Sequence, residues 1–121
     1  MKKYFVVLLS LFLLVGCSSG KNNDNGLISY MDAKEKIINN GAVLIDVRTE
    51  EEFNQKHIEG AVMLTLDTIS DETASEVIDN KDTPVIVYCR SGNRSSQAVT
   101  LLNDLGYTDV YDLGSIDNWK E

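Results

Sequence analysis

The sequence has few of the residues that bind metals, form disulfides or contact nucleic acids. Its 121 residues include two cysteines and one histidine, too few soft ligands for a zinc site. Lysine and arginine number 11 against 19 aspartates and glutamates, so the net charge is -8. Such an acidic chain is not expected to bind nucleic acid or to adhere to an anionic lipid surface through its folded part. We therefore expect one small domain that needs no metal and no cofactor.

The sequence also lacks an apolar run long enough to cross a membrane. The longest, from Tyr4 to Val15 with one serine inside it, is shorter than the ~20 residues that a spanning helix requires. Lys2 and Lys3 precede this run and small residues follow it, which is the pattern of a secretory signal. A core helix is the alternative, but the run has no polar face for such a helix to present to water.

The end of this run, Leu14-Val15-Gly16-Cys17, resembles the lipobox of bacterial lipoproteins. The resemblance implies that residues 1–16 are a signal peptide and that Cys17 becomes the lipidated first residue of the mature protein. The polar, glycine-bearing stretch 17–26 then serves as a flexible tether, and the folded domain occupies 27–121. We expect an extracytoplasmic bacterial lipoprotein that is attached to a membrane by its acyl chains.

Strands and helices alternate along residues 27–121. Apolar periodicity, capping residues and glycines predict helices over 29–41, 70–80 and 95–105, strands over 42–47, 62–66, 85–88 and 109–113, and a terminal helical turn over 115–120. In the first helix Ala33, Ile37 and Ile38 are expected to face the core. Because hairpin signals are absent, the pattern indicates an α/β fold with an open, mostly parallel sheet and helices on both faces.

The most informative segment is PVIVYCRSGNRSSQAVTLL, from Pro84 to Leu102. A short apolar strand leads directly to Cys89, a polar loop follows, and a helical pattern then begins. This order places the sulfur at a strand end and at the N-terminus of a helix, where unpaired N–H groups and the helix dipole favour an anion. We expect Cys89 to be held as a nucleophilic thiolate.

An inert buried cysteine is the alternative interpretation of this segment. Against it, Arg90 and Arg94 place positive charge beside the thiol, and Gly92 permits the tight curl that turns successive N–H groups inward. With Cys17 lipidated, Cys89 has no partner for an internal disulfide. A lone thiol in an exported protein is a candidate reactive group.

Three other polar features fit structural roles better than catalytic or binding roles. Asp46 and Arg48 follow a predicted strand and favour a structural ion pair, although the strand end also fits a shared cleft with Cys89. His57 is not assigned to catalysis, because a thiolate held by arginines and a helix dipole needs no general base. The glutamates at 50–52 fit a helix N-terminus, with Thr49 and Glu52 as a capping box, better than an acidic binding patch.

Three ordered motifs make the chain similar to the rhodanese family of sulfurtransferases from Ile28 to the C-terminus. They are LIDVRTEEEFNQKHIEGA, YCRSGNRSSQAV, and Leu113-Gly114 with Trp119. The departures from the family pattern lie at Lys56, Met63, Thr65 and Ser115, outside the Cys89 loop.

The resemblance implies that Cys89 accepts a sulfane sulfur as a persulfide. The loop residues Arg90, Ser91, Gly92, Asn93, Arg94 and Ser95 would form the substrate-binding cradle, with the two arginines meeting an anionic donor. The donor would be a small anion such as thiosulfate, and the acceptor would be cyanide or a thiol.

Two other classes of protein remain open. Cysteine-dependent phosphatases and arsenate reductases use a similar loop, but theirs resembles Cys-x5-Arg, whereas only four residues separate Cys89 from Arg94 here. Non-catalytic rhodanese-like binding modules typically lack the cysteine that this chain has.

Overall fold

The structure is a computed structural model that describes residues 26–120. The predicted signal peptide, the lipid attachment at Cys17 and the tether up to residue 25 lie outside the described residues, so those expectations stay predictions. No helix within 26–120 has the length and apolar character needed to cross a bilayer.

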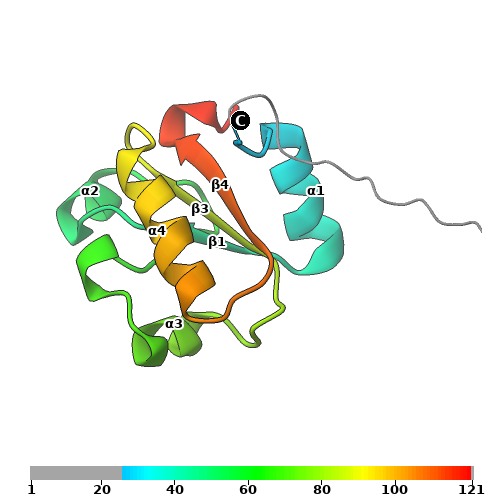
Figure 1. The fold of residues 1–121 in the computed structure, drawn as a ribbon. Coiled ribbons are helices and arrows are strands. Elements are labelled where there is room, and N and C mark those ends of the chain that lie inside the picture. The colour runs from blue at the N-terminus through cyan, green and yellow to red at the C-terminus, as the bar shows by residue number, and fades with distance from the viewer. Residues whose placement is uncertain (1–25, 121) are drawn as a thin grey trace, which may run out of the picture.

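Four parallel strands form the sheet. They are β1 (Val43–Asp46), β2 (Val62–Met63), β3 (Val85–Cys89) and β4 (Val110–Ser115), and they lie in the order β2-β1-β3-β4. The strand β3 therefore has a neighbour on each side, and all five of its residues are buried. Because the strands are parallel, β1, β3 and β4 end at the same edge, where the predicted site residues follow (Figure 1).

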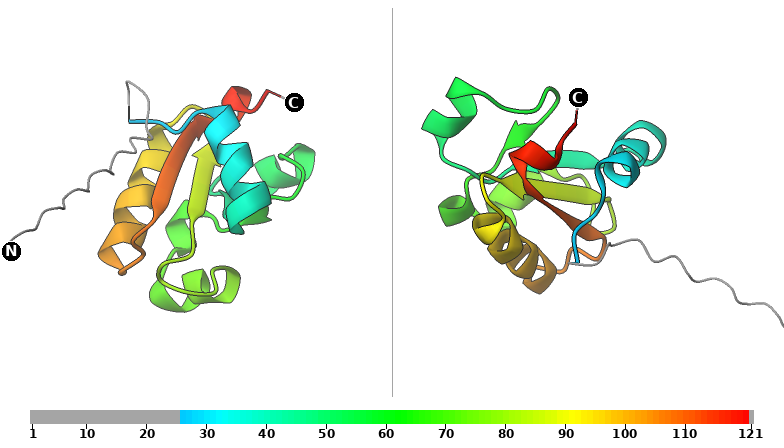
Figure 2. Two further views of the ribbon diagram at one scale, coloured as in Figure 1. Left: turned by 90° about the vertical axis from the view of Figure 1, so that its right-hand side faces the viewer. Right: turned by 90° about the horizontal axis from the view of Figure 1, so that it is seen from above.

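Helices cover both faces of the sheet, as the sequence predicts. The α-helices are α1 (Tyr30–Asn40), α2 (Glu50–Gln55), α3 (Asp71–Val77) and α4 (Asn93–Asp104), and two 3-10 turns are η3 (Leu66–Thr68) and η4 (Ile116–Asn118). Figure 2 shows α4 on one side of the strands and α1 on the other. The expected α/β architecture with an open parallel sheet is confirmed.

The side chains of β3 alternate between the two cores. Val85, Val87 and Cys89 point into the cluster that includes buried residues of α3 and α4, while Ile86 and Tyr88 point into the cluster with Ala33 of α1. This is the two-residue period of a strand that is covered on both faces. Because side chains alternate along β3, Cys89 points to the same side as Val85 and Val87, toward α4.

One predicted core residue and two predicted element boundaries were wrong. Ile38 is 67% exposed, because it lies one position beyond the stripe that Ala33 and Ile37 form at a spacing of four. The expected strand over 62–66 is a strand only at Val62–Met63, and the 3-10 turn η3 follows. The helix α4 begins at Asn93 rather than at residue 95, so Asn93 and Arg94 belong to its first turn.

Candidate active site

Cys89 is the last residue of β3, and it is fully buried. Ser115 at the end of β4 is its register partner across the sheet. The register slips by one residue just before this point, so that Val87 pairs with Asp112 and Tyr88 pairs with Gly114. The sulfur therefore lies at the edge of the sheet where the chain leaves β3 for α4, as the sequence predicts.

Two backbone N–H groups donate hydrogen bonds to the sulfur of Cys89. One comes from Gly92 at 2.9 Å and the other from Ser95 at 3.2 Å. Gly92 is the N-cap of α4 with φ of 104°, a left-handed conformation that residues with a Cβ rarely adopt. The loop is braced by the Ser95 hydroxyl, which donates to the carbonyl oxygen of Gly92 at 3.1 Å. This arrangement stabilises negative charge on the sulfur.

The first turn of α4 offers further donors. The backbone N–H groups of Asn93 and Arg94 occupy the first helical positions and have no hydrogen-bond partner within residues 26–120. Ser91 is exposed, and the side chain of Asn93 accepts a hydrogen bond from Gln97 at 2.7 Å. The donors to the sulfur therefore come from the loop backbone, and within residues 26–120 neither Ser91 nor Asn93 forms a side-chain hydrogen bond to it.

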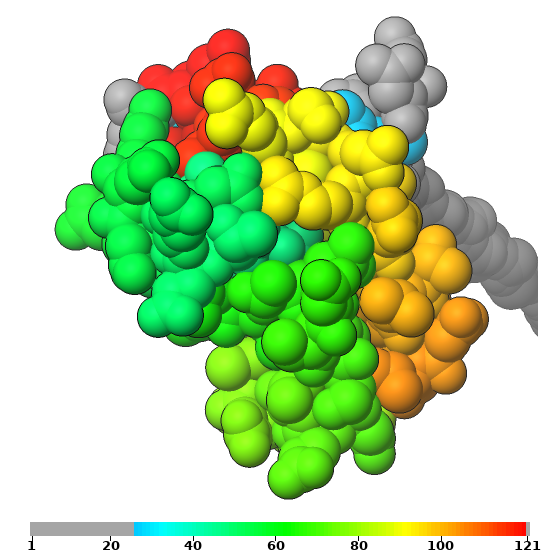
Figure 3. All heavy atoms as spheres, turned by 90° about the vertical axis from the view of Figure 1, so that its left-hand side faces the viewer, coloured from blue at the N-terminus to red at the C-terminus, as the bar shows by residue number. Residues whose placement is uncertain are grey.

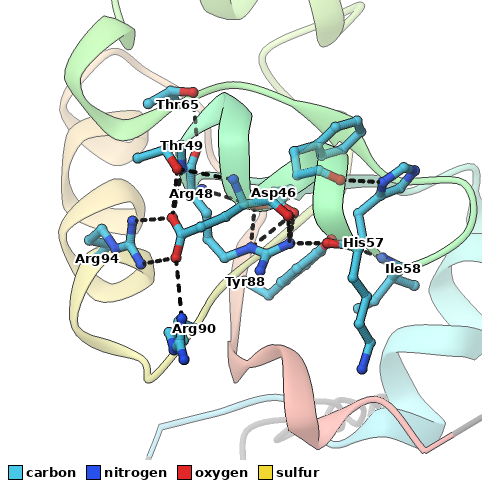
Figure 4. A network of polar contacts seen from close by, with 12 residues as sticks. Asp46, Arg48, Thr49, His57, Ile58, Thr65, Tyr88, Arg90 and Arg94 are labelled. Atoms are coloured by element: carbon cyan, nitrogen blue, oxygen red, sulfur yellow. Dashed lines mark hydrogen bonds and ion pairs between the residues drawn. The ribbon is translucent and has the colours of Figure 1, made fainter.

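The two arginines of the loop converge on one carboxylate, that of Glu52 in α2. Arg94 donates to both of its oxygens, at 2.9 Å and 3.0 Å, and a nitrogen of Arg90 lies 3.9 Å from one of them. Figure 4 shows Arg90 and Arg94 pointing toward this shared carboxylate. The Arg94 side chain is 31% exposed and that of Arg90 is 75% exposed, so Arg94 is held in place and Arg90 remains largely in solvent.

Sequence reasoning assigned Glu52 to a helix cap and missed its contact with the loop. The capping box itself is confirmed, since the Glu52 carboxylate accepts from the Thr49 N–H at 2.9 Å and Thr49 caps the Glu52 N–H. The hydrogen bonds from Arg94, and next those from Thr49, lower the pKa of Glu52 from 4.5 to about 2. No local pattern links residues 52 and 94, so only the fold reveals this pair.

The helix α2 is fixed by the buried ion pair that the sequence favoured. The Arg48 guanidinium donates three hydrogen bonds to the two carboxylate oxygens of Asp46, and the shortest is 2.8 Å. Asp46 is fully buried, and its hydrogen bonds raise the pKa of Arg48. The same guanidinium donates to the carbonyl oxygens of Glu52 and Lys56 at the end of α2. The pair thereby acts at a distance from the sulfur by holding the helix that carries Glu52 (Figure 4).

His57 and Tyr88 hold the segment after α2. The ring of His57 stacks on Phe53 and its Nδ1 contacts the Phe53 carbonyl oxygen at 2.8 Å, so it has a structural role. The Tyr88 hydroxyl accepts the N–H of Ile58 at 3.1 Å, and burial raises the pKa of Tyr88. Neither side chain is a partner of the Cys89 sulfur.

Asp112 is a second residue that sequence reasoning missed. Its carboxylate accepts the N–H of Gly114 at 2.8 Å, and burial raises its pKa against the smaller opposing effects of Ser95 and of this N–H. The bond to Gly114 lies where β4 shifts its register next to Cys89. No three histidine, cysteine, aspartate or glutamate side chains gather into a potential metal site among residues 26–120.

Comparison with known proteins places this geometry in a family. Residues 29–121 match the family profile described as "Rhodanese-like domain". The thiosulfate sulfurtransferase PspE of Escherichia coli is 40% identical over 72 residues, which cover 60% of this chain and 68% of that protein. The thiosulfate sulfurtransferase GlpE of Coxiella burnetii is 33% identical over 94 residues, covering 77% and 85%.

Solved structures agree with this assignment. A rhodanese from E. coli, described as containing anions, has a TM-score of 0.60 at 34% identity and covers 64% of this chain and 89% of that one. The protein SSP1007 of Staphylococcus saprophyticus has a TM-score of 0.63 at 29% identity, covering 78% and 92%. The chain that carries Cys89 at the end of β3 therefore belongs to the rhodanese-like domain family.

Proposed function

We propose that this protein is a sulfurtransferase that carries a sulfane sulfur on Cys89. The observation that supports this most is the pair of N–H groups, from Gly92 and Ser95, that donate to the cysteine sulfur. The unpaired N–H groups of Asn93 and Arg94 next to them are available to a second sulfur attached to the first. Curated relatives at 33–40% identity are named thiosulfate sulfurtransferases.

The reaction divides into two transfers. The thiolate of Cys89 attacks the outer sulfur of thiosulfate, the S–S bond of the donor breaks, and sulfite leaves with the bonding electrons. The enzyme then carries a Cys89–S–S⁻ persulfide. In the second transfer cyanide or a thiolate attacks the terminal sulfur, which leaves as thiocyanate or as a new persulfide and regenerates the Cys89 thiolate. The loop N–H groups stabilise the negative charge on the sulfur in each state.

The direct test uses purified protein, thiosulfate and cyanide. We expect thiocyanate and sulfite to form, and Cys89→Ser to abolish the reaction, because a serine hydroxyl stays protonated and cannot hold the sulfur. Mass spectrometry after thiosulfate alone should show one added sulfur atom on Cys89. An aryl phosphate should not be hydrolysed. Substantial activity of the serine variant, or phosphatase activity of comparable rate, would reject the proposal.

We also propose that the protein acts outside the cytosol from a lipid anchor on Cys17. The support is the lipobox-like Leu14-Val15-Gly16-Cys17 after an apolar run too short to span a bilayer. The full chain expressed in a bacterium should partition with membranes and incorporate labelled fatty acid, and Cys17→Ala should do neither. An unlabelled, soluble wild-type protein whose N-terminus is Ser18 or later would contradict the anchor.

A further inference from the structure

We call the entrance to the Cys89 loop, formed by Arg90, Arg94 and Glu52, the mouth of the site. An anionic donor would be expected to meet two free arginines there, but the Glu52 carboxylate already contacts both. Glu52 occupies both terminal nitrogens of Arg94, at 2.9 Å and 3.0 Å, and one of its oxygens lies 3.9 Å from Arg90. The two arginine charges are thus opposed by one carboxylate, and the Cys89 thiolate of the proposed function would add a second negative charge. The mouth carries little net positive charge toward an incoming anion.

Glu52 is fixed in this place by its own helix. Oε1 of Glu52, which accepts from Arg94 at 2.9 Å, also accepts from the N–H of Thr49 at 2.9 Å and from the Thr49 hydroxyl at 3.0 Å. Only 20% of the Glu52 side chain is exposed, and its pKa of about 2 keeps it ionised at any physiological pH. An anion that competes for Arg94 would have to displace a carboxylate held by four hydrogen bonds, or bind beside it. In Figure 3 the atoms of α2 adjoin those of the loop and the start of α4 on one face.

The energetic effect of this carboxylate depends on the charge of the donor. The repulsion between Glu52 and a bound donor is proportional to the donor charge, so a dianion is disfavoured by twice as much free energy as a monoanion. Thiosulfate carries two negative charges. A thiosulfonate or a simple persulfide carries one.

We propose that Glu52 is a donor-specificity residue, which disfavours dianionic sulfur donors such as thiosulfate relative to singly charged thiosulfonate or persulfide donors. This inference rests on the proposed function of Cys89. With a thiosulfonate R–SO₂–S⁻, the Cys89 thiolate takes the outer sulfur, the S–S bond breaks and the sulfinate R–SO₂⁻ leaves, so the chemistry matches that with thiosulfate. Only the charge of the donor differs.

The test compares thiosulfate with methanethiosulfonate anion, in which a methyl group replaces one charged oxygen. Glu52→Gln removes the charge and keeps an oxygen that can accept from Thr49, as capping boxes allow. We expect Glu52→Gln to raise kcat/KM for thiosulfate about tenfold. For methanethiosulfonate we expect a rise of about threefold, because the repulsion between Glu52 and a singly charged donor is half as large in free energy. Glu51→Gln, on the exposed side of the same helix, removes the same net charge and should change the ratio of the two donors little.

Binding measured in a Cys89→Ser background separates this inference from the proposed function. There Glu52→Gln should tighten thiosulfate more than methanethiosulfonate, whether or not the wild type transfers sulfur. An unchanged ratio of the two affinities would overturn the role of Glu52 even if sulfur transfer is normal. Equal losses of kcat/KM with both donors would also overturn it, because they would show that Glu52 only positions Arg94.

A measurement on the wild type covers the case in which Glu52→Gln does not fold. If Glu52 neutralises the mouth, kcat/KM of the wild type for thiosulfate should change little with ionic strength, and no more than that for methanethiosulfonate. A steep fall with salt that is larger for thiosulfate would show an uncompensated positive site and would overturn the inference.

Discussion

The backbone N–H of Gly92 donates a 2.9 Å hydrogen bond to the sulfur of Cys89, three residues earlier in the chain. The bond requires the chain to turn back on itself directly after β3, and Gly92 makes this turn with φ of 104°. The same residue caps α4 without any side-chain hydrogen bond. One glycine thus closes the loop around the sulfur and starts the helix whose first turn faces it.

Gly92→Ala should impair sulfur transfer more than it impairs folding. Space for a Cβ exists, since the nearest atom is the Cα of Gly114 at 3.9 Å, but the positive φ makes alanine strained by about 1–3 kcal/mol. Relaxing that strain moves the N–H away from the sulfur. Gly106→Ala is the matched control, with φ of 102° and, as its nearest atoms, those of the flexible Lys81 side chain at 3.8 Å, just past the C-terminal end of α4.

Both glycine variants should lose similar unfolding free energy in urea. Only Gly92→Ala should lose thiosulfate–cyanide activity beyond what the loss of folded protein explains. Equal effects of the two variants on activity would show that the turn at Gly92 matters only for stability.

Arg94→Ala should lower kcat/KM for thiosulfate by roughly 100-fold, a typical effect of removing one group that stabilises an anion in a reaction. The loss has two causes, because the variant removes a positive charge and leaves the charge of the Glu52 carboxylate opposed only by the more distant Arg90. Adding Glu52→Gln to Arg94→Ala should therefore restore part of the activity. Arg90→Ala should cost only a few-fold, since the Arg90 side chain is 75% exposed.

Circular dichroism gives the control for the arginine variants. If Arg94→Ala unfolds the domain while Arg90→Ala is silent, Arg94 is a structural brace between α4 and α2. In that case the assignment of Arg94 to the donor site is wrong.

Arg48→Ala should destabilise the domain by about 3–5 kcal/mol, because it leaves the fully buried carboxylate of Asp46 without a charged partner. The exposed pair of Lys81 and Asp71 has the same 2.8 Å contact but side chains that are 49% and 74% exposed. Lys81→Ala should cost much less, because water screens the charges of an exposed pair. Urea unfolding of both variants measures the difference, and equal losses would contradict the stated dependence on burial.

Stability should fall in acid partly through Glu52. Its pKa is lower in the folded state, at about 2, than the ordinary 4.5, so the folded state binds fewer protons between these values. The stabilisation is therefore complete above pH 4.5 and is lost as the pH falls toward 2. In that window the unfolding free energy of Glu52→Gln should depend less on pH than that of the wild type. Glu51→Gln, which removes an exposed carboxylate of the same helix, is the matched control for the lost charge.

The sequence alone was sufficient for the order of elements and for the place of Cys89 between a strand and a helix. Apolar runs of strand length between helical patterns predicted the parallel sheet, because both signals are local and their periods differ. The position of Cys89 between a strand and a helix with Gly92 in between predicted the loop, since capping and turn preferences act over a few residues. Asp46 and Arg48 are two residues apart, so their pairing was also a local inference.

Tertiary structure decided which distant groups meet at the loop. Glu52 and Arg94 are 42 residues apart, and their contact arises because Arg48 anchors α2 to β1 while β3 delivers α4 beside it. The capping box fully explained Glu52 in the sequence, so no unused signal pointed to a second role. The contact of Asp112 with the N–H of Gly114 lies where β4 shifts its register next to Cys89. Local physics thus determined the Cys89 loop, whereas the packing of α2 determined the charge that surrounds it.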